Sequence, residues 1–290
     1  MLTLRTPAKI NPVLEVLGPR PDGYHELALV FQAVGLYDQL TFQKKEKGVQ
    51  LSLSEGPNDL AADDSNLIVK AAKLFITEVL QDKAGVQVTL QKNIPMAAGL
   101  GGGSSDAAAT LRGLQWLFEV PVSEEKLADM AGRLGSDVPF FLTGGAALGT
   151  GRGEKIEPWT SSAQFSLLLV KTPEGLSTPA VYRSGKAQLT SGEKAKSFQA
   201  LLKKGNTKEI VSALFNGLEP AAFYLRPDVK RVKERLMEEG VLGALVSGSG
   251  PTVFAVTSTA GEAKNIGEKF QGEGFEVFVT ETISGGVERQ

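Results

Sequence analysis

The chain has 290 residues, 42% of them hydrophobic and 22% charged, which is an ordinary composition for a globular protein. Its 31 basic and 33 acidic residues leave a formal net charge of −2, so neither nucleic acid nor an anionic membrane is expected as a partner. The absence of cysteine excludes disulfides, cysteine metal sites and thiol nucleophiles, and it fits a cytoplasmic protein. The single histidine excludes a multi-histidine metal site.

The first part of the chain mixes strands and helices. Proline cannot donate to a sheet, so Pro12 predicts an edge or a bulge in the first extended segment. The predicted elements, in chain order, are an extended segment over 1–17, a turn over 20–23, strands over 27–34 and 38–43, a helix over 65–80, a strand over 86–91, helices over about 105–118 and 124–134, and apolar segments 140–142 and 146–148 on either side of a Gly144-Gly145 turn.

The character of the sequence changes near Pro158, which predicts domains over 1–157 and 158–290. The elements expected in the second domain are a strand over 165–170, mixed helix and loop over 179–220, a helix over 228–239, strands over 244–247 and 252–256, a helix over 260–270 and a strand over 275–280. This order predicts an α+β sandwich of the ferredoxin-like kind. The polar stretch 184–197 is predicted to be an exposed loop without an assigned role.

The segment Pro95–Ser105, with the sequence PMAAGLGGGSS, joins a predicted strand to a predicted helix. The start of a helix carries unpaired N–H groups and partial positive charge, and glycines let a ligand approach them closely. The segment therefore predicts a phosphate cradle, in which Ser104 and Ser105 cap the helix or bond a phosphate oxygen or Mg²⁺; the alternative is a flexible glycine turn. It is not a P-loop, because no lysine follows the glycines, and Ser104 breaks the dinucleotide-binding pattern.

Three motifs, taken in order, resemble those of the GHMP kinase superfamily. They are Thr6–Asn11 continuing to Arg20–Leu27, Pro95–Ala108, and Ser247–Pro251. The first motif is narrower and, with Gly135–Phe141, is similar to the 4-diphosphocytidyl-2-C-methyl-D-erythritol kinase family. Two departures are Pro12, where that family often has leucine, and Tyr182, where some relatives have phenylalanine.

The resemblance implies an α+β, two-lobed GHMP kinase fold, with a ribosomal-protein-S5-like N-terminal domain that carries the phosphate-binding loop and a ferredoxin-like C-terminal domain on the substrate side. The implied activity is ATP-dependent phosphorylation of the 2-hydroxyl of 4-(cytidine 5'-diphospho)-2-C-methyl-D-erythritol in the non-mevalonate route to isoprenoid precursors. The implied cofactors are ATP and Mg²⁺, with Mg²⁺ bridging the phosphates and no metal-binding side chains assigned. The expected partner is a small cytidylated molecule, and no obligate protein partner is expected.

The resemblance assigns catalysis to Asp137, as the general base for the substrate hydroxyl, and to Lys9, which pairs with Asp137 and faces the transferring phosphoryl group. From the residues alone, Asp137 has the alternative of a helix cap after Gly135, and Lys9 has that of a surface lysine. The apolar neighbours of Lys9 favour the functional role. The residues expected at the nucleotide are Asn66, Pro95, Met96, Ala97, Ala98, Gly99, Leu100, Gly101, Gly102, Gly103, Ser104, Ser105 and Asp106.

The residues expected at the substrate are Asn11, Tyr24, His25, Tyr182, Gly248 and Ser249. Asn11 offers a donor and an acceptor to the diol or diphosphate, and the two tyrosines are placed on either side of the cytosine ring. The alternatives are a structural role for His25, a helix cap for Asn66 and a hairpin turn over 248–251. Two other functions remain open: a GHMP kinase for mevalonate, homoserine or a sugar, and a non-catalytic nucleotide-binding protein on the same fold.

Overall fold

The structure is a computed structural model that describes residues 1–55, 60–160 and 163–290. In the described chain the elements are, in order, β1 (Leu2–Pro19), β2 (His25–Lys45), β3 (Val49–Glu55), α1 (Leu67–Glu78), β4 (Gly85–Gln91), α2 (Gly102–Phe118), α3 (Glu124–Leu134), α4 (Val138–Thr143), β5 (Ala146–Gly151), β6 (Lys155–Trp159), β7 (Ser166–Lys171), α5 (Thr178–Arg183), α6 (Glu193–Lys204), α7 (Thr207–Ser212), β8 (Phe215–Asn216), α8 (Glu219–Leu225), α9 (Pro227–Glu238), β9 (Gly243–Val246), β10 (Val253–Thr257), α10 (Ala260–Glu268), β11 (Glu276–Glu281) and β12 (Glu288–Arg289).

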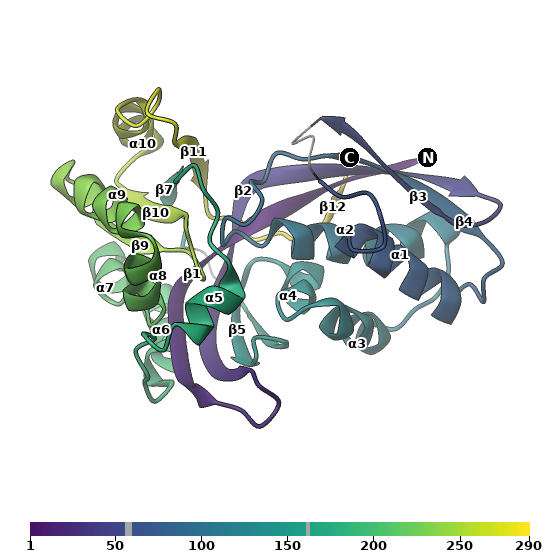
Figure 1. The fold of residues 1–290 in the computed structure, drawn as a ribbon, viewed down its shortest axis with the longest axis horizontal. Helices are drawn as coiled ribbons and strands as arrows, with labels where there is room; N and C mark the ends of the chain where they lie inside the picture. Colours follow the sequence, from purple (N-terminus) through teal and green to yellow (C-terminus); the bar gives the residue numbers. More distant parts are fainter. Residues whose placement is uncertain (56–59, 161–162) are drawn as a thin grey trace.

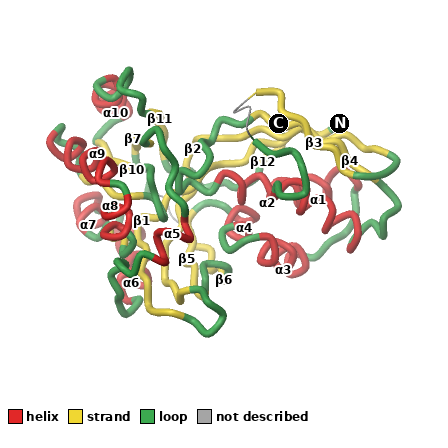
Figure 2. The backbone as a smooth tube through the Cα atoms, in the orientation of Figure 1, coloured by secondary structure: helices red, strands yellow, loops and turns green. Residues whose placement is uncertain are grey.

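The first sheet is built on the long antiparallel pair β1 and β2 and has the order β12-β1-β2-β4-β3, with β5, β6 and β8 joined at its sides. Helices α1 to α4 cover one face of it (Figures 1 and 2). Helix α2 carries small residues, Ala107–Ala109, that are all buried among the elements packed around it. The approach of the helix to the sheet is so close that a Cβ added at Gly113 would lie 2.8 Å from the ring of Phe42. Burial of such apolar surface is the main stabilising contribution to this half.

The second sheet has the order β11-β7-β10-β9, and all of its neighbours are antiparallel. With the helices between β7 and β9 and with α10 after β10, this is the ferredoxin-like order that the sequence predicted. The α+β, two-lobed prediction is therefore confirmed. The predicted bulge at Pro12 is also present, because the register of β1 against β2 shifts between Ile10 and Val13.

Some predicted elements were wrong. The strands expected over 27–34 and 38–43 form one strand, because β2 changes its second partner from β5 to β4 along its length while β1 stays paired to it. Phe140–Leu142, expected as an apolar segment before the Gly144-Gly145 turn, does precede these glycines and lies in a helix, α4. Helix α2 begins at Gly102, earlier than residue 105. Strands β3 and β6 were not predicted.

The stretch 184–197 is not a free loop, which corrects the expectation from its polar composition. Helix α6 begins at Glu193, and the buried carboxylate of Glu15 accepts hydrogen bonds from the amides of Gly192 and Ala195. The amide of Thr190 donates to the carbonyl of Val16 at 2.9 Å. Backbone and carboxylate partners on β1 therefore hold this stretch in place.

The end of the chain returns to the first sheet, where β12 pairs with β1. Strand β8 also pairs with β1, so both halves of the sequence contribute to this sheet. The exact domain boundary near residue 157 stays a prediction. Among the helices of the described residues, none combines the length and the apolar character needed to cross a membrane.

Candidate functional site

A cavity of about 790 Å³ is lined by residues from both halves of the chain. All predicted site residues line it except Leu100 and Ser105. Leu100 is buried in an apolar cluster with Ala8 and Ile10. Ser105 is also buried: its hydroxyl donates to the carbonyl of Pro7 at 2.6 Å and lies 2.6 Å from the hydroxyl of Thr6. Ser105 thus ties α2 to β1 and faces away from the cavity.

The glycine segment places the N-terminus of α2 at this cavity. Gly101 is the N-cap residue, with a φ of 73°, and no side chain caps the first turn. Glycine is required here, since a Cβ at Gly101 would lie 2.8 Å from Phe141. The amide of Lys9 donates to the carbonyl of Leu100 at 3.0 Å, which anchors the segment to β1. The uncapped amides at the start of the helix form a site suited to an anion.

Lys9 and Asp137 meet beside this helix start. The Lys9 ammonium lies 3.5 Å from the Asp137 carboxylate and donates to Asn11 Oδ1 at 2.6 Å. The Lys9 side chain is only 5% exposed, so it is not a surface lysine, whereas Asp137 is 34% exposed. Asp137 does occupy the N-cap position of α4, but its side chain makes no capping hydrogen bond. The carboxylate therefore stays accessible beside the lysine.

The third motif, Ser247–Pro251, packs against the glycine segment of the second motif. Ser247 Oγ donates to the carbonyl of Gly99 at 2.9 Å, and a Cβ at Gly99 would lie 2.2 Å from the carbonyl oxygen of Ser247. A Cβ at Gly248 would lie 3.1 Å from the Lys9 ammonium. Ser249 Oγ is 2.7 Å from Thr178 Oγ1 on α5. The three glycine-bearing motifs therefore converge on Lys9.

Aromatic side chains form another wall of the cavity. The His25 and Tyr182 rings are 5.0 Å apart with their planes tilted by 32°. Tyr24 is more than half exposed, and the Arg152 guanidinium lies 4.7 Å from the centre of its ring. Burial, together with the negative charge of Asp137, raises the pKa of Tyr182, so its hydroxyl is neutral. The placement of a base between Tyr24 and Tyr182 stays a prediction.

Asn66 caps α1, because its side-chain oxygen accepts from the amide of Ile68 at 2.9 Å and its side-chain nitrogen donates to Ala61. It also lines the cavity. The capping role therefore holds, and it is compatible with a place near a nucleotide.

A buried ionic cluster behind the helix start was not predicted. The Lys92 ammonium pairs with Asp38 and lies 3.1 Å from Asp106 Oδ2. Asp38 Oδ1 also accepts from the amides of Asn93 and Ile94. A Cβ at Gly102 would lie 2.7 Å from the Lys92 ammonium, so this cation supports the floor of the glycine segment.

Within that cluster, Asp106 has the least favourable environment for a charged carboxylate. Burial raises its pKa to about 8; Lys92 opposes the increase and Asp38 adds to it. Its Oδ1 is buried without a hydrogen-bond partner among the described atoms. Arg152 is a further cavity residue that the motifs did not indicate. The sequence signal available for the cluster was a lysine and an aspartate on either side of the apolar and glycine-rich segment.

Comparison with known proteins agrees with this geometry. Residues 66–145 match the GHMP kinases N terminal domain, and residues 198–276 match GHMP kinases C terminal. The chain therefore belongs to the GHMP kinase family. It is 41% identical over 285 residues to the 4-diphosphocytidyl-2-C-methyl-D-erythritol kinase of Pelotomaculum thermopropionicum, which covers 98% of this chain and 99% of that relative. Within the family, the chain thus falls in the group of 4-diphosphocytidyl-2-C-methyl-D-erythritol kinases.

Solved structures give the same result. A crystal structure of 4-(cytidine 5'-diphospho)-2C-methyl-D-erythritol kinase superposes with a TM-score of 0.82 at 32% identity, covering 98% of this chain and 100% of the other. A homoserine kinase from Cytophaga hutchinsonii gives a TM-score of 0.78 at 20% identity, covering 100% and 97%. The second likeness concerns the fold alone.

Proposed function

We propose that this kinase transfers the γ-phosphoryl group of ATP to the 2-hydroxyl of 4-(cytidine 5'-diphospho)-2-C-methyl-D-erythritol, a step toward isoprenoid precursors. The observation that carries the proposal is the Lys9–Asp137 pair, 3.5 Å apart beside the uncapped start of α2. The relatives at about 40% identity supply the substrate class. The proposed place of action is the cytoplasm, without an obligate protein partner.

The glycine segment fits a triphosphate. Positions 99 and 101 line the cavity and leave no room for a side chain, so only backbone groups, including their amides, can meet a ligand there. These amides and Ser104 hold the phosphates in the proposal, and Asn66, which lines the same cavity, is assigned to the adenine. Mg²⁺ would arrive with the nucleotide, with no side chain of this chain assigned as its ligand, and would neutralise part of the phosphate charge.

The catalytic proposal assigns one task to each member of the pair. The Asp137 carboxylate accepts a hydrogen bond from the substrate hydroxyl, orients it and takes its proton late in the transfer. A loose phosphoryl-transfer transition state does not require the alcohol to be deprotonated first. Lys9, with its ammonium fixed by Asn11 and Asp137, stabilises the negative charge on the transferring group.

The cytidine end of the substrate is assigned to the aromatic wall. Tyr24, His25 and Tyr182 hold the pyrimidine, since stacking on an aromatic ring contributes roughly 1–3 kcal/mol per base. Asn11, Gly248 and Ser249 line the same cavity, and in the proposal they bind the diol and the diphosphate.

The catalytic roles are tested by Asp137→Asn and Lys9→Met, assayed for ATP turnover with the cytidylated substrate. We expect kcat to fall about 100-fold or more in each, because each variant removes an interaction made in the transition state. Asp129→Asn and Lys126→Met on α3 are matched controls outside the cavity and are expected to keep normal turnover. Near-normal kcat in both site variants, with the fold intact, would rule out these catalytic roles for Lys9 and Asp137.

The substrate assignment is tested with a panel of alcohols. We expect the cytidylated methylerythritol to give the highest kcat/KM, because mevalonate, homoserine and free sugars have no base for the aromatic wall. Preference for one of these would establish a different GHMP kinase. Calorimetric binding of ATP with no transfer to any alcohol would instead indicate a non-catalytic nucleotide-binding protein.

A further inference from the structure

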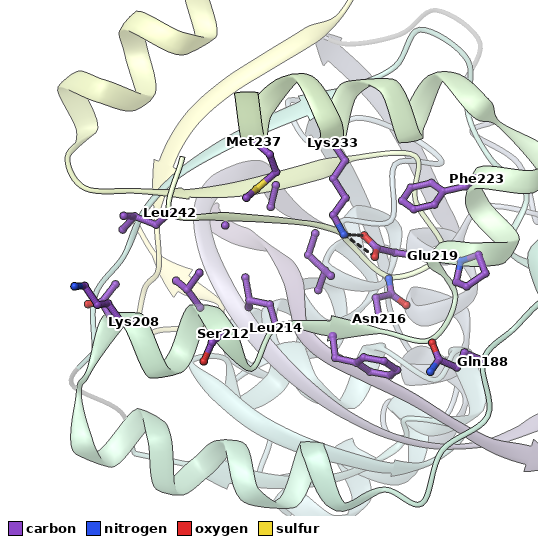
Figure 3. Close-up of a pocket in the computed structure, with 17 residues that line it drawn as sticks. Gln188, Lys208, Ser212, Leu214, Asn216, Glu219, Phe223, Lys233, Met237 and Leu242 are labelled. Carbon is purple, nitrogen blue, oxygen red and sulfur yellow. Dashed lines mark hydrogen bonds and ion pairs between the residues drawn. The ribbon is translucent and has the colours of Figure 1, made fainter. Parts of the chain in front are cut away.

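A second cavity, of about 720 Å³, lies between α7, α8, α9 and β9 (Figure 3). It shares no lining residue with the catalytic cavity. Its volume falls within the roughly 300–1,000 Å³ typical of small-molecule sites. The wall is mainly apolar, with side chains from Val211, Leu214, Phe223, Met237, Leu242 and Leu245. A cavity of this size and lining is suited to a ligand with an apolar body.

One end of this cavity is polar. Figure 3 shows Lys233 reaching from α9 to Glu219, with Asn216 beside the pair. The Lys233 ammonium donates to both Glu219 oxygens, at 2.8 and 2.7 Å. Glu219 Oε1 also accepts from the amide of Val246 at 3.1 Å. Both charged groups are largely withdrawn from water, with side-chain exposures of 26% and 14%.

The remaining hydrogen-bonding capacity of this end favours an anion. An ammonium has three N–H donors, and Glu219 takes two of those of Lys233. The carboxylate of Glu219 already accepts three hydrogen bonds. Lys233 and Glu219 balance each other's charge at this end, and Lys208, which Figure 3 shows on the opposite side of the cavity, brings the sum of the three charged lining residues to 2 − 1 = +1. This end therefore offers a hydrogen-bond donor rather than an acceptor, and because the lining as a whole is positive, an anionic head complements the cavity better than a cation does.

We propose that this cavity is a binding site for a small amphipathic anion. Its carboxylate or phosphate head accepts the third N–H of Lys233, and its apolar body lies against Leu214, Met237 and Leu242. The head and the body are recognised by different parts of the cavity, so both are needed for binding. The proposal is independent of the identity of the kinase substrate.

The methionines of the chain provide the measurement, because there are four of them in different surroundings. Met237 lines the second cavity, Met96 lines the catalytic cavity and Met130 is fully buried in the core. Methyl-labelled methionine therefore gives one NMR signal for each site and one internal control. Met237→Leu and Met96→Leu identify the two reporting signals.

The probe is octyl phosphate, titrated into the full-length protein. We expect a saturable shift of the Met237 methyl signal with the Met130 signal unchanged. Inorganic phosphate carries the head alone, and octyltrimethylammonium carries the same chain with a cationic head; neither is expected to saturate the Met237 shift. Octanoate distinguishes a carboxylate head from a phosphate head, and saturation by either acid supports the shared anionic chemistry.

A matched pair of variants on α9 tests the contact itself. Lys233→Gln removes the proposed donor, and we expect the dissociation constant for octyl phosphate to rise about tenfold or more. Lys230→Gln, at a 57% exposed position on the same helix, is expected to leave it unchanged. The proposal is overturned if octyl phosphate does not shift the Met237 methyl signal. It is equally overturned if octyltrimethylammonium binds with the same dissociation constant as octyl phosphate. It is also overturned if a folded Lys233→Gln protein binds as tightly as the parent.

Discussion

Asp106 shows how strongly position can change the chemistry of a single residue. It lies in the first turns of α2, where its carboxylate faces Lys92 and, beyond it, Asp38. Burial raises the pKa of Asp106 to about 8, with Lys92 lowering it and Asp38 raising it. One cation thus balances two carboxyl groups directly behind the phosphate cradle, and a proton on Asp106 removes the excess negative charge.

This proton predicts a dependence of stability on pH. An aspartate in an unfolded chain has a pKa near 3.9, so between about pH 4 and pH 8 the folded protein holds a proton on Asp106 that the unfolded chain has lost. Its contribution to the free energy of unfolding therefore decreases as pH rises through that window. Asp106→Asn needs no such proton. We expect the stability of Asp106→Asn relative to the parent to increase by about 1 kcal/mol per pH unit in the window.

Urea unfolding at pH 5, 6.5 and 8 measures this difference. Asp129→Asn replaces an exposed carboxylate on α3, and its stability difference from the parent is expected to be nearly constant across the same range. A constant difference for Asp106→Asn as well would contradict the proton assignment.

The sequence predicts residues within motifs better than contacts between them. Lys9 and Asp137 were found from their motif letters, and the structure brings them together. The partnership of Lys92 with Asp38, 54 residues apart, depends on the sheet order and was not visible. Ser104 and Ser105 are identical letters, yet one lines the cavity and the other bonds β1, because successive helix residues point about 100° apart.

At the scale of elements, two glycines at the start of α2, Gly101 and Gly103, differ in the space available for a side chain. Gly101 has a φ of 73°, and an added Cβ would lie 2.8 Å from Phe141 and 3.0 Å from Lys9. At Gly103, the nearest heavy atom, on Leu67, would be 3.7 Å away. Gly101→Ala is expected to lower the free energy of unfolding by about 1–3 kcal/mol and to displace Lys9. Gly103→Ala is expected to be neutral or stabilising by up to about 1 kcal/mol.

Denaturant unfolding of the two alanine variants compares these effects within one loop. Equal stability of both variants would mean that the start of α2 adapts to a side chain and is not held rigid by β1 and α4.

Elements with strong local signals were predicted well. Helix α3 begins after Ser123, which caps it, and its predicted bounds agree with the structure. Strand β6 was missed because it lies at a side of the sheet and its short sequence, KIEPW, has no clear alternation. Strand β3 alternates apolar and polar residues as β4 does, so this pattern could have predicted it. The division of β2 between residues 34 and 38 was wrong because partners on both sides, rather than local propensity, decide where a long strand ends.

At the scale of the whole molecule, the catalytic site depends on contacts between the two halves. The Gly248 loop belongs to the second sheet, yet it lies against Gly99 and Lys9 of the first half. Asn216 holds this loop from behind: its side-chain nitrogen donates to the carbonyls of Val246 and Gly248, both at 2.8 Å. Its oxygen accepts from the amide of Leu218, also at 2.8 Å.

Asn216→Ala therefore tests whether the second half positions the substrate. The change leaves buried backbone groups without partners, so we expect a loss of about 1–3 kcal/mol of stability. The released loop binds the alcohol in the proposed reaction, so the KM for the alcohol is expected to rise about tenfold, which corresponds to about 1.4 kcal/mol of binding. The KM for ATP should change less, because β1 and α2 hold the phosphate cradle. Asn206→Ala, at the N-cap of α7, is the control that loses helix stability without touching the loop. A larger effect on the KM for ATP than on that for the alcohol would assign the Gly248 loop to the nucleotide.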